Sequence, residues 1–206
     1  MAKQLKLKSE TQSDVRAKVG FQRFNIQMPC YRDQIFTEAD QANPYKKMTQ
    51  AYKELVYRDR PYYLFMTLTF PLTMSYFHRC KYTSRFIKKH NKMIFGPDYL
   101  KRDDHMEGYA FFEEHPSIEF PDRYHVHLLV NSNYRYAGWN LKTHTDIFHK
   151  AADKVVVGGQ KVFKHDCIDI REAGNDLRIR YCFKQIEDRN LDHLKIIGKN
   201  GLSDSF

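Results

Sequence analysis

Cysteine is scarce in this sequence, and the few cysteines are far apart. They are Cys30, Cys80, Cys167 and Cys182, and no two of them form a CxxC pair. Zinc knuckles and disulfide frameworks need cysteines at short, regular spacings, so neither is expected here. Scattered thiols are typical of proteins in a reducing compartment, and we expect a cytoplasmic location.

Long apolar runs and nucleotide-binding loops are also missing. No segment approaches the roughly 20 apolar residues that span a bilayer. The N-terminal MAKQLKLKSETQSD has basic residues without an apolar segment behind them, so it does not resemble a secretion signal. No GxxxxGK[ST] motif occurs, which argues against an attached helicase. We expect no membrane partner, and any duplex unwinding would have to come from another enzyme.

Positive charge and aromatic side chains are abundant. The chain has 34 Lys+Arg against 25 Asp+Glu, a formal charge of +9, with 14 Tyr and 15 Phe. A basic field attracts polyanions, and aromatic faces stack on unpaired bases. Many basic, tyrosine-rich proteins bind no nucleic acid, however, so composition alone leaves this open.

Hydrophobic periodicity and turn residues predict an α+β domain. The expected elements are a helix from Pro44 to about Leu55, a strand at 61–70, a helix at 75–94, strands at 108–115 and 124–130, a helix at 144–156, a strand at 161–170 and a helix at 175–188. This β-α-β-β-α-β order predicts a ferredoxin- or RRM-like antiparallel sheet, with helices on one face and the active site on the other. We expect a basic arm and helix at 1–58, irregular over 1–40, the main domain at 59–190 and a tail at 191–206.

A pair of histidines lies on one of the predicted strands. His125 and His127 are two residues apart, so their side chains share a face with Cα atoms about 6.6 Å apart. Two imidazoles at this spacing can converge on one cation. A chain with 10 histidines can also contain an HxH by chance, so the pair needs support from other residues.

The preceding strand carries two acids. Alternation assigns Glu113 and Glu114 to opposite faces, so only one can lie beside the histidines. That carboxylate could complete a metal site, and the alternative is a solvated acid at a sheet edge.

The last predicted helix presents a phenol and an ammonium together. Ile179, Cys182, Phe183 and Ile186 form the stripe expected to pack on the protein, and Tyr181 and Lys184 lie on the opposite side. The phenol and the ammonium are therefore presented together, away from the side that anchors the helix. Phenol, with a pKa near 10, is a poor nucleophile unless a nearby cation assists it.

Taken in order, YLFMTLTF, HVHLLV and YCFK resemble motifs 1, 2 and 3 of the HUH endonuclease superfamily. The similarity covers about residues 61–188 and is strongest to rolling-circle replication initiators with one catalytic tyrosine. It implies that His125 and His127 bind Mg²⁺ or Mn²⁺. Glu113-Glu114-His115 is similar to the family's acid-x-His element, which makes Glu113 the third ligand. Tyr181 would be the nucleophile and Lys184 its motif lysine; Gln185 stands where some relatives have a second tyrosine.

The resemblance implies metal-dependent nicking and joining of single-stranded DNA at a replication origin, through a 5′-phosphotyrosine. The partners would be a host helicase and polymerase, in the cytoplasm of a host cell. Other side chains are candidate DNA contacts. Thr67 and Thr69 could touch the DNA backbone or simply favour a strand, and Tyr134, Tyr136 and Trp139 could stack on bases.

Three alternatives remain. The same motifs occur in conjugative relaxases and HUH transposases, which differ in their DNA substrates. The protein could also be a non-catalytic RRM-like nucleic-acid-binding module, in which case the three motifs occur by chance. Two histidines and a carboxylate also suit an iron oxygenase, but the basic charge and the Tyr-Lys pair have no role there.

Overall fold

The computed structural model describes residues 44–70, 74–113, 124–131, 139–163, 168–174, 176–187 and 191–203. These residues lie within one unit, Glu38–Phe206. The expected irregular arm at 1–40 lies outside the described residues.

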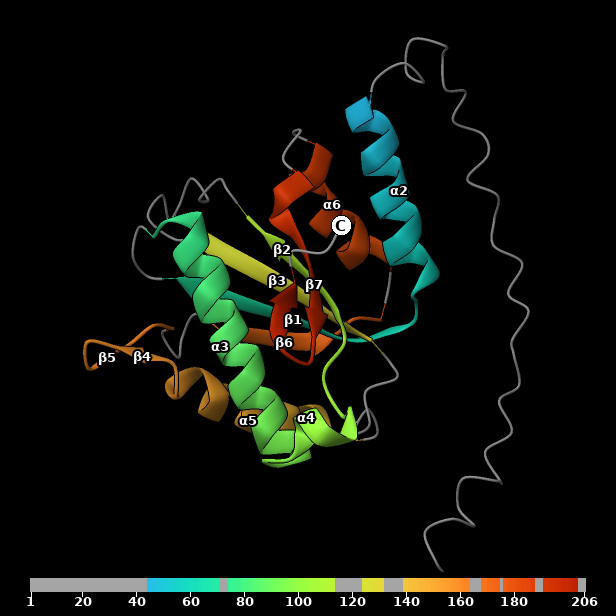
Figure 1. The fold of residues 1–206 in the computed structure, drawn as a ribbon. Coiled ribbons are helices and arrows are strands. Elements are labelled where there is room, and N and C mark those ends of the chain that lie inside the picture. Colours follow the sequence, from blue (N-terminus) through green and yellow to red (C-terminus); the bar gives the residue numbers. More distant parts are fainter. Residues whose placement is uncertain are drawn as a thin grey trace, which may run out of the picture. The chain divides into compact units, whose positions relative to one another are not determined.

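A six-stranded antiparallel sheet forms the centre of this unit (Figure 1). Its order is β6-β1-β3-β2-β7-β8, with bounds Ile168–Glu172, Tyr62–Phe70, Tyr124–Asn131, Gly108–Phe112, Leu194–Gly198 and Gly201–Ser203. The first four strands in this order give the arrangement expected of a split β-α-β fold, since β1 lies between β3 and β6 and β3 lies between β1 and β2, so each half's first strand is inserted between the two strands of the other half. The predicted α+β class with an antiparallel sheet is confirmed.

Two long helices cover one face of the sheet. They are α3 (Tyr76–Phe95), capped by the Ser75 side chain, and α5 (Leu141–Asp153), capped by Asn140. Every second residue of the strands points toward them, so one continuous apolar core forms on this face. Its fully buried members include Leu64, Met66, Leu68, Phe86, Ala110, Phe112, Val126, Leu128, Val130 and Phe148.

The other face is more covered than the sequence suggested. We expected helices on one face only, but α2 (Pro44–Arg58) and α6 (Asp176–Glu187) pack against a second apolar cluster on the opposite side. This cluster joins Val56, Ile179, Cys182 and Phe183 to outward residues of the strands, including Phe65, Tyr109, Phe111 and Leu129. Because Val56 is fully buried, α2 belongs to the folded unit, and the expected boundary at residue 58 does not separate it.

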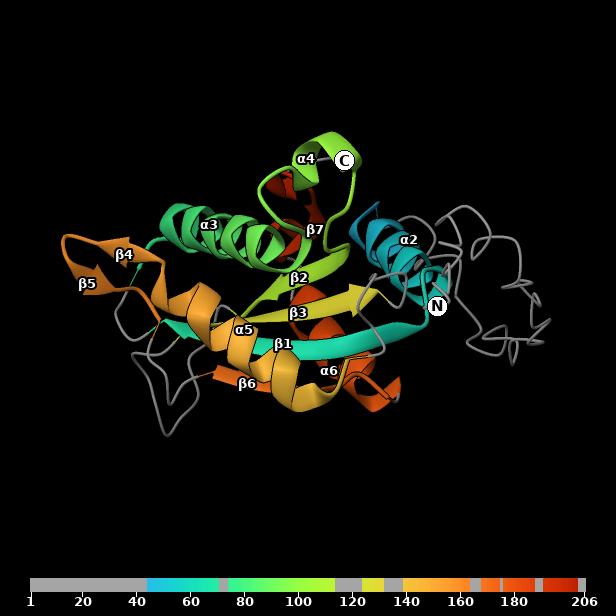
Figure 2. The ribbon, with the colours of Figure 1, turned by 90° about the horizontal axis from the view of Figure 1, so that it is seen from below.

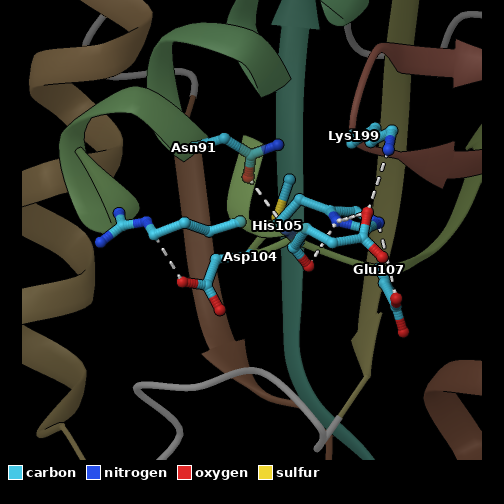
Figure 3. A network of polar contacts seen from close by, with 8 residues as sticks. Asn91, Asp104, His105, Glu107 and Lys199 are labelled. Atoms are coloured by element: carbon cyan, nitrogen blue, oxygen red, sulfur yellow. Dashed lines mark hydrogen bonds and ion pairs between the residues drawn. The ribbon is translucent and has the colours of Figure 1, made fainter. Parts of the chain in front are cut away.

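The C-terminal segment also differs from the expected tail. β7 pairs antiparallel with β2 and β8 pairs with β7, and Leu194 and Ile197 are buried. An ion pair fastens this hairpin to the loop before β2 (Figure 3): Lys199 Nζ lies 3.1 Å from Asp103 Oδ1. Within the same loop, His105 Nε2 lies 3.5 Å from Glu107 Oε1. Residues 191–203 therefore extend the sheet, and the expected boundary at residue 190 falls inside it.

Two further differences concern short elements. A four-residue helix, α4 (Tyr99–Arg102), follows α3. The expected strand at 161–170 is split, since β4 (Val156–Val157) and β5 (Gln160–Lys161) form a separate hairpin that projects from the body in Figure 2 and β6 begins at Ile168. Within the described ranges, no helix is long and apolar enough to cross a membrane.

Candidate active site

The two histidines lie on the second face of the sheet, and each is held by a threonine of the neighbouring strand. In the β1–β3 pairing, Thr67 is opposite His127 and Thr69 is opposite His125. Thr67 Oγ1 lies 3.0 Å from Nδ1 of His127, and Thr69 Oγ1 lies 2.8 Å from Nδ1 of His125. When Nδ1 donates its proton to such an oxygen, Nε2 keeps the lone pair that a cation needs.

The imidazole rings are fixed in parallel. Their centroids are 6.4 Å apart and their planes differ by 6°. Phe65 stacks on His127 with centroids 5.2 Å apart, which holds that ring from the side. Among the described residues, Nε2 of His127 is buried and has no hydrogen-bond partner. The carboxylate of Glu113 lies 3.6 Å from this atom, beyond the usual hydrogen-bond distance, and a cation held between the two would satisfy both.

Glu113 directly follows β2 and lies on the histidine face. Its Oε2 is 3.6 Å from Nε2 of His127, and the residue is 9% exposed. Burial raises its pKa, but His127, His125 and Lys184 outweigh burial, and the net pKa of Glu113 is lowered. Arg79 of α3 donates a hydrogen bond to the carbonyl oxygen of Glu113 at 3.0 Å, which fixes the end of the strand. Glu114, the alternative ligand, lies outside the described residues.

Tyr181 projects from α6 beside the histidine pair. Its ring meets that of His127 edge to face, with centroids 5.3 Å apart. The buried stripe of Ile179, Cys182 and Phe183 anchors the helix, as expected, and leaves Tyr181 44% exposed. Burial, the charge of Glu113 and the neighbouring Cys182 all raise the pKa of Tyr181. The phenol is therefore protonated at neutral pH in the structure as it stands.

Two cations of α6 flank this phenol. Lys184 Nζ lies 5.1 Å from the centroid of the Tyr181 ring, and Arg178 Cζ lies 5.9 Å from that of Phe65. Arg178, Tyr181 and Lys184 follow each other at three-residue spacing, so they lie along one side of the helix. An anionic group that approached Tyr181 would meet a positive charge on either side.

Two imidazoles and a carboxylate are suitable ligands for a divalent cation, but in this structure the two imidazoles are too far apart to share one. Within the described part of the chain, no three His, Cys, Asp or Glu side chains form a ready-made metal cluster. A shared ion at about 2.1 Å from each Nε2 requires the two atoms to be within about 4.2 Å of each other. Because the parallel rings have centroids 6.4 Å apart, they must lean toward each other to share an ion.

Of the residues expected to contact DNA, the two threonines lie beside the histidines and Trp139 lies far from them. The hydroxyls of Thr67 and Thr69 form hydrogen bonds with the histidines, so they hold the imidazole rings instead of contacting the DNA backbone. Trp139 lies at the start of α5, where its carbonyl oxygen accepts a hydrogen bond from Tyr63 and its ring contacts His144. Tyr63 and Thr69 are six residues apart on β1, about 20 Å, so Trp139 lies far from the histidines. Tyr134 and Tyr136 fall outside the described residues.

Sequence reasoning missed the supporting residues. The alternating Thr67 and Thr69 match the alternating histidines, but this pairing depends on strand register, which one sequence does not reveal. Arg79 has the signature of an ordinary helix-surface cation, although it is only 4% exposed and stacks on Tyr124. Alternation alone assigns Phe65 to the histidine face, but it does not predict that the Phe65 ring stacks on His127.

Comparisons with known proteins identified no relative of this chain. No protein-family model, no curated protein and no solved structure matches the chain.

Proposed function

We propose that this protein is an HUH-type endonuclease that nicks and rejoins single-stranded DNA at a replication origin, with Tyr181 as the nucleophile. The observation that carries the proposal is the meeting of four side chains from three separate segments: Glu113, His125, His127 and Tyr181. The Tyr181 and His127 rings are 5.3 Å apart, and Glu113 Oε2 is 3.6 Å from His127 Nε2. A non-catalytic binding module has no need of this grouping.

The proposed reaction is a transesterification. The Tyr181 oxygen attacks the phosphorus of a phosphodiester, and the bond to the 3′ oxygen breaks with its electron pair. The phenolic proton passes to solvent on the exposed side of Tyr181, and the leaving oxygen takes up a proton to give a free 3′-OH. The protein retains a 5′-phosphotyrosine, and attack by a 3′-OH on this adduct rejoins the strand. One phosphodiester replaces another, so no ATP is required.

The surrounding residues have distinct parts in this proposal. Lys184 and Arg178 neutralise the phosphate as it approaches, and Phe65, Thr67 and Thr69 hold the imidazoles in place. His125, His127 and Glu113 would hold Mg²⁺ or Mn²⁺, which when bound supplies a Lewis acid for a non-bridging phosphate oxygen. Neutralising Glu113 also removes one of the charges that raise the pKa of Tyr181.

The first test asks where the covalent link forms. The protein is incubated with Mn²⁺ and a pool of single-stranded oligonucleotides, and peptides that carry a nucleotide are identified by mass spectrometry. We expect the adduct on Tyr181, and none with Tyr181→Phe. Tyr45→Phe is the matched control, because Tyr45 is also exposed, at 54%. An adduct that persists in the Tyr181 variant would show that another residue is the nucleophile.

The second test separates chemistry from binding. His125→Ala, or a chelator added to the unmodified protein, should abolish cleavage while binding of single strands persists. Binding without cleavage under every metal condition would instead favour the non-catalytic module. A relaxase or transposase would share the chemistry, and cleavage of transfer origins or transposon ends in place of replication origins would identify it.

A further inference from the structure

The exposed face of α3 carries a stripe of cations that the proposed active site does not use. The helix contains Arg79, Lys81, Arg85, Lys88, Lys89 and Lys92 and no Asp or Glu. All of these except Arg79 are exposed. Lys81, Arg85, Lys88 and Lys92 follow the i, i+4, i+7, i+11 pattern, which places them in one row along a single side of the helix.

Nothing among the described residues neutralises this row. The ion pairs between described Lys or Arg and Asp or Glu side chains involve α2, α4, α5, α6, β5, β6, the β7–β8 hairpin and loops, and none of them includes these four side chains. The α5 helix beside it, in contrast, mixes its lysines with Asp146 and Asp153. Four like charges on adjacent turns repel one another, and such a row is relieved when a polyanion binds.

We propose that this α3 stripe, defined as Lys81, Arg85, Lys88 and Lys92, is a second nucleic-acid surface and that its occupant is a duplex. Lys81 and Lys92 are eleven residue steps apart along the helix, about 17 Å, so the row can follow several consecutive phosphates of one strand. A duplex hides its bases and offers phosphates, which cations alone can hold. Single strands are bound through aromatic stacking as well, and the two aromatic residues between Lys81 and Lys92, Tyr82 and Phe86, are both buried. The exposed Phe77 lies one turn before Lys81, at the N-terminal end of the row.

The position of the stripe separates it from the active site. The buried side of α3 packs on the first face of the sheet through Phe86 and Ile87, whereas Tyr181 and the histidines lie on the second face. Figure 1 shows α3 in front of the sheet and α6 behind it. A duplex on α3 therefore leaves the second face free for a single strand.

A membrane surface fits the stripe less well. Helices that lie on anionic membranes insert an apolar face below their cations. The apolar face of α3 is already buried in the core, where Phe86 and Ile87 are fully inaccessible. A rigid row of charges with no insertable face suits the rigid, evenly spaced phosphates of a duplex.

The test compares two charge-matched variants. The stripe variant is Lys81→Gln, Arg85→Gln, Lys88→Gln and Lys92→Gln; the control variant is Lys47→Gln, Lys142→Gln, Lys150→Gln and Lys154→Gln, four exposed lysines outside α3. Binding of a blunt duplex of about 20 base pairs is measured by fluorescence anisotropy over a salt series. We expect the stripe variant to bind at least about tenfold more weakly, and its log–log salt slope to be shallower by roughly three units, since each phosphate contact contributes about 0.9. The control variant should stay close to the unmodified protein.

Three results would overturn the proposal. They are duplex binding equal in the stripe and control variants, no duplex binding by the unmodified protein, and stripe-dependent binding of phosphatidylserine vesicles without duplex binding. Competition with an unlabelled single strand tests whether the surface is separate: we expect the duplex to remain bound, and its displacement would place both ligands on one surface. Tyr181→Phe should bind the duplex normally, so failure of the nicking proposal and failure of this one are distinguishable.

Discussion

At the scale of single residues, the threonines of β1 decide how the histidines of β3 can act. An imidazole presents a lone pair at Nε2 only if its proton resides on Nδ1, and an oxygen that accepts a hydrogen bond from Nδ1 favours this tautomer. The hydroxyl oxygens of Thr67 and Thr69 lie 3.0 and 2.8 Å from Nδ1 of His127 and His125, where they can accept that bond. They also limit rotation of the rings, and this matters because the rings must lean together to share an ion.

We therefore predict that Thr67→Val lowers cleavage by roughly tenfold to a hundredfold, the usual effect of losing an outer-sphere partner of a metal-bound histidine. Valine has the shape of threonine and lacks its hydroxyl, so the packing of β1 is retained. Cleavage is assayed against Mn²⁺ concentration, and we expect the variant to need more metal for half-maximal rate.

Thr67→Ser is the matched control, because serine keeps the hydroxyl and loses a methyl group. It should retain most of the activity and the original metal requirement. If the valine and serine variants behave alike, Thr67 acts through packing, and the tautomer argument is wrong.

At the scale of helices and strands, the sequence predicted those elements whose residues alternate or repeat clearly. The alternation of Leu64, Met66 and Leu68 predicted β1, and the stripe of Ile179, Cys182 and Phe183 predicted which side of α6 is buried. Both patterns arise from burial of one face, so they can be read along the chain.

The C-terminal hairpin was missed for a different reason. LKIIG and GLS are short and joined by a tight turn, and their strand character depends on the exposed edge of β2, which is remote in sequence. Pairing partners, register and the second apolar cluster are properties of contacts between segments. For the candidate site, the sequence predicted the grouping of Glu113, the histidines and Tyr181 on one face. It did not predict Arg79 or the threonine contacts.

We predict that β7 stabilises the fold and that its two adjacent isoleucines contribute differently to the free energy of unfolding. Ile197 is 2% exposed in the main core, so Ile197→Ala should lower the free energy of unfolding by about 2–4 kcal/mol. Ile196 is only partly buried, and Ile196→Ala should lower it by about 1 kcal/mol. Urea unfolding followed by circular dichroism measures both. Equal, small effects would mean that residues 191–203 are dispensable, as a tail would be.

At the scale of the whole molecule, the sheet separates two kinds of surface. One face presents Tyr181 and the imidazoles, and the helix on the other face presents the α3 stripe. The net charge of +9 is therefore unevenly placed, since α3 alone contributes six cations and no anion. The two proposals together describe a protein that could hold a duplex and process an adjoining single strand.

The same α3 helix also links the stability of the whole molecule to pH. His90 lies on its buried side, completely inaccessible, between the rings of Phe86 and Phe148. Burial, together with the nearby His144, lowers the pKa of His90 from 6.5 to about 3. Protonation is thus favoured in the unfolded chain, so the contribution of His90 to stability is complete above pH 6.5 and is lost as the pH falls from 6.5 toward 3.

We predict that His90→Leu makes the free energy of unfolding less dependent on pH below 6.5. Leucine is close to histidine in volume and does not titrate, so the variant should lose the steep dependence of one proton, about a tenfold change in the unfolding equilibrium per pH unit. Urea unfolding between pH 4 and 7 gives this slope directly. The free energy of unfolding at pH 7 also depends on how the leucine packs, whereas its slope against pH reports only proton uptake. His78→Gln, at an exposed position of α3, is the control and should keep the slope of the unmodified protein. An unchanged slope in His90→Leu would mean that acid unfolding is governed by other groups and that His90 is not the buried neutral histidine described.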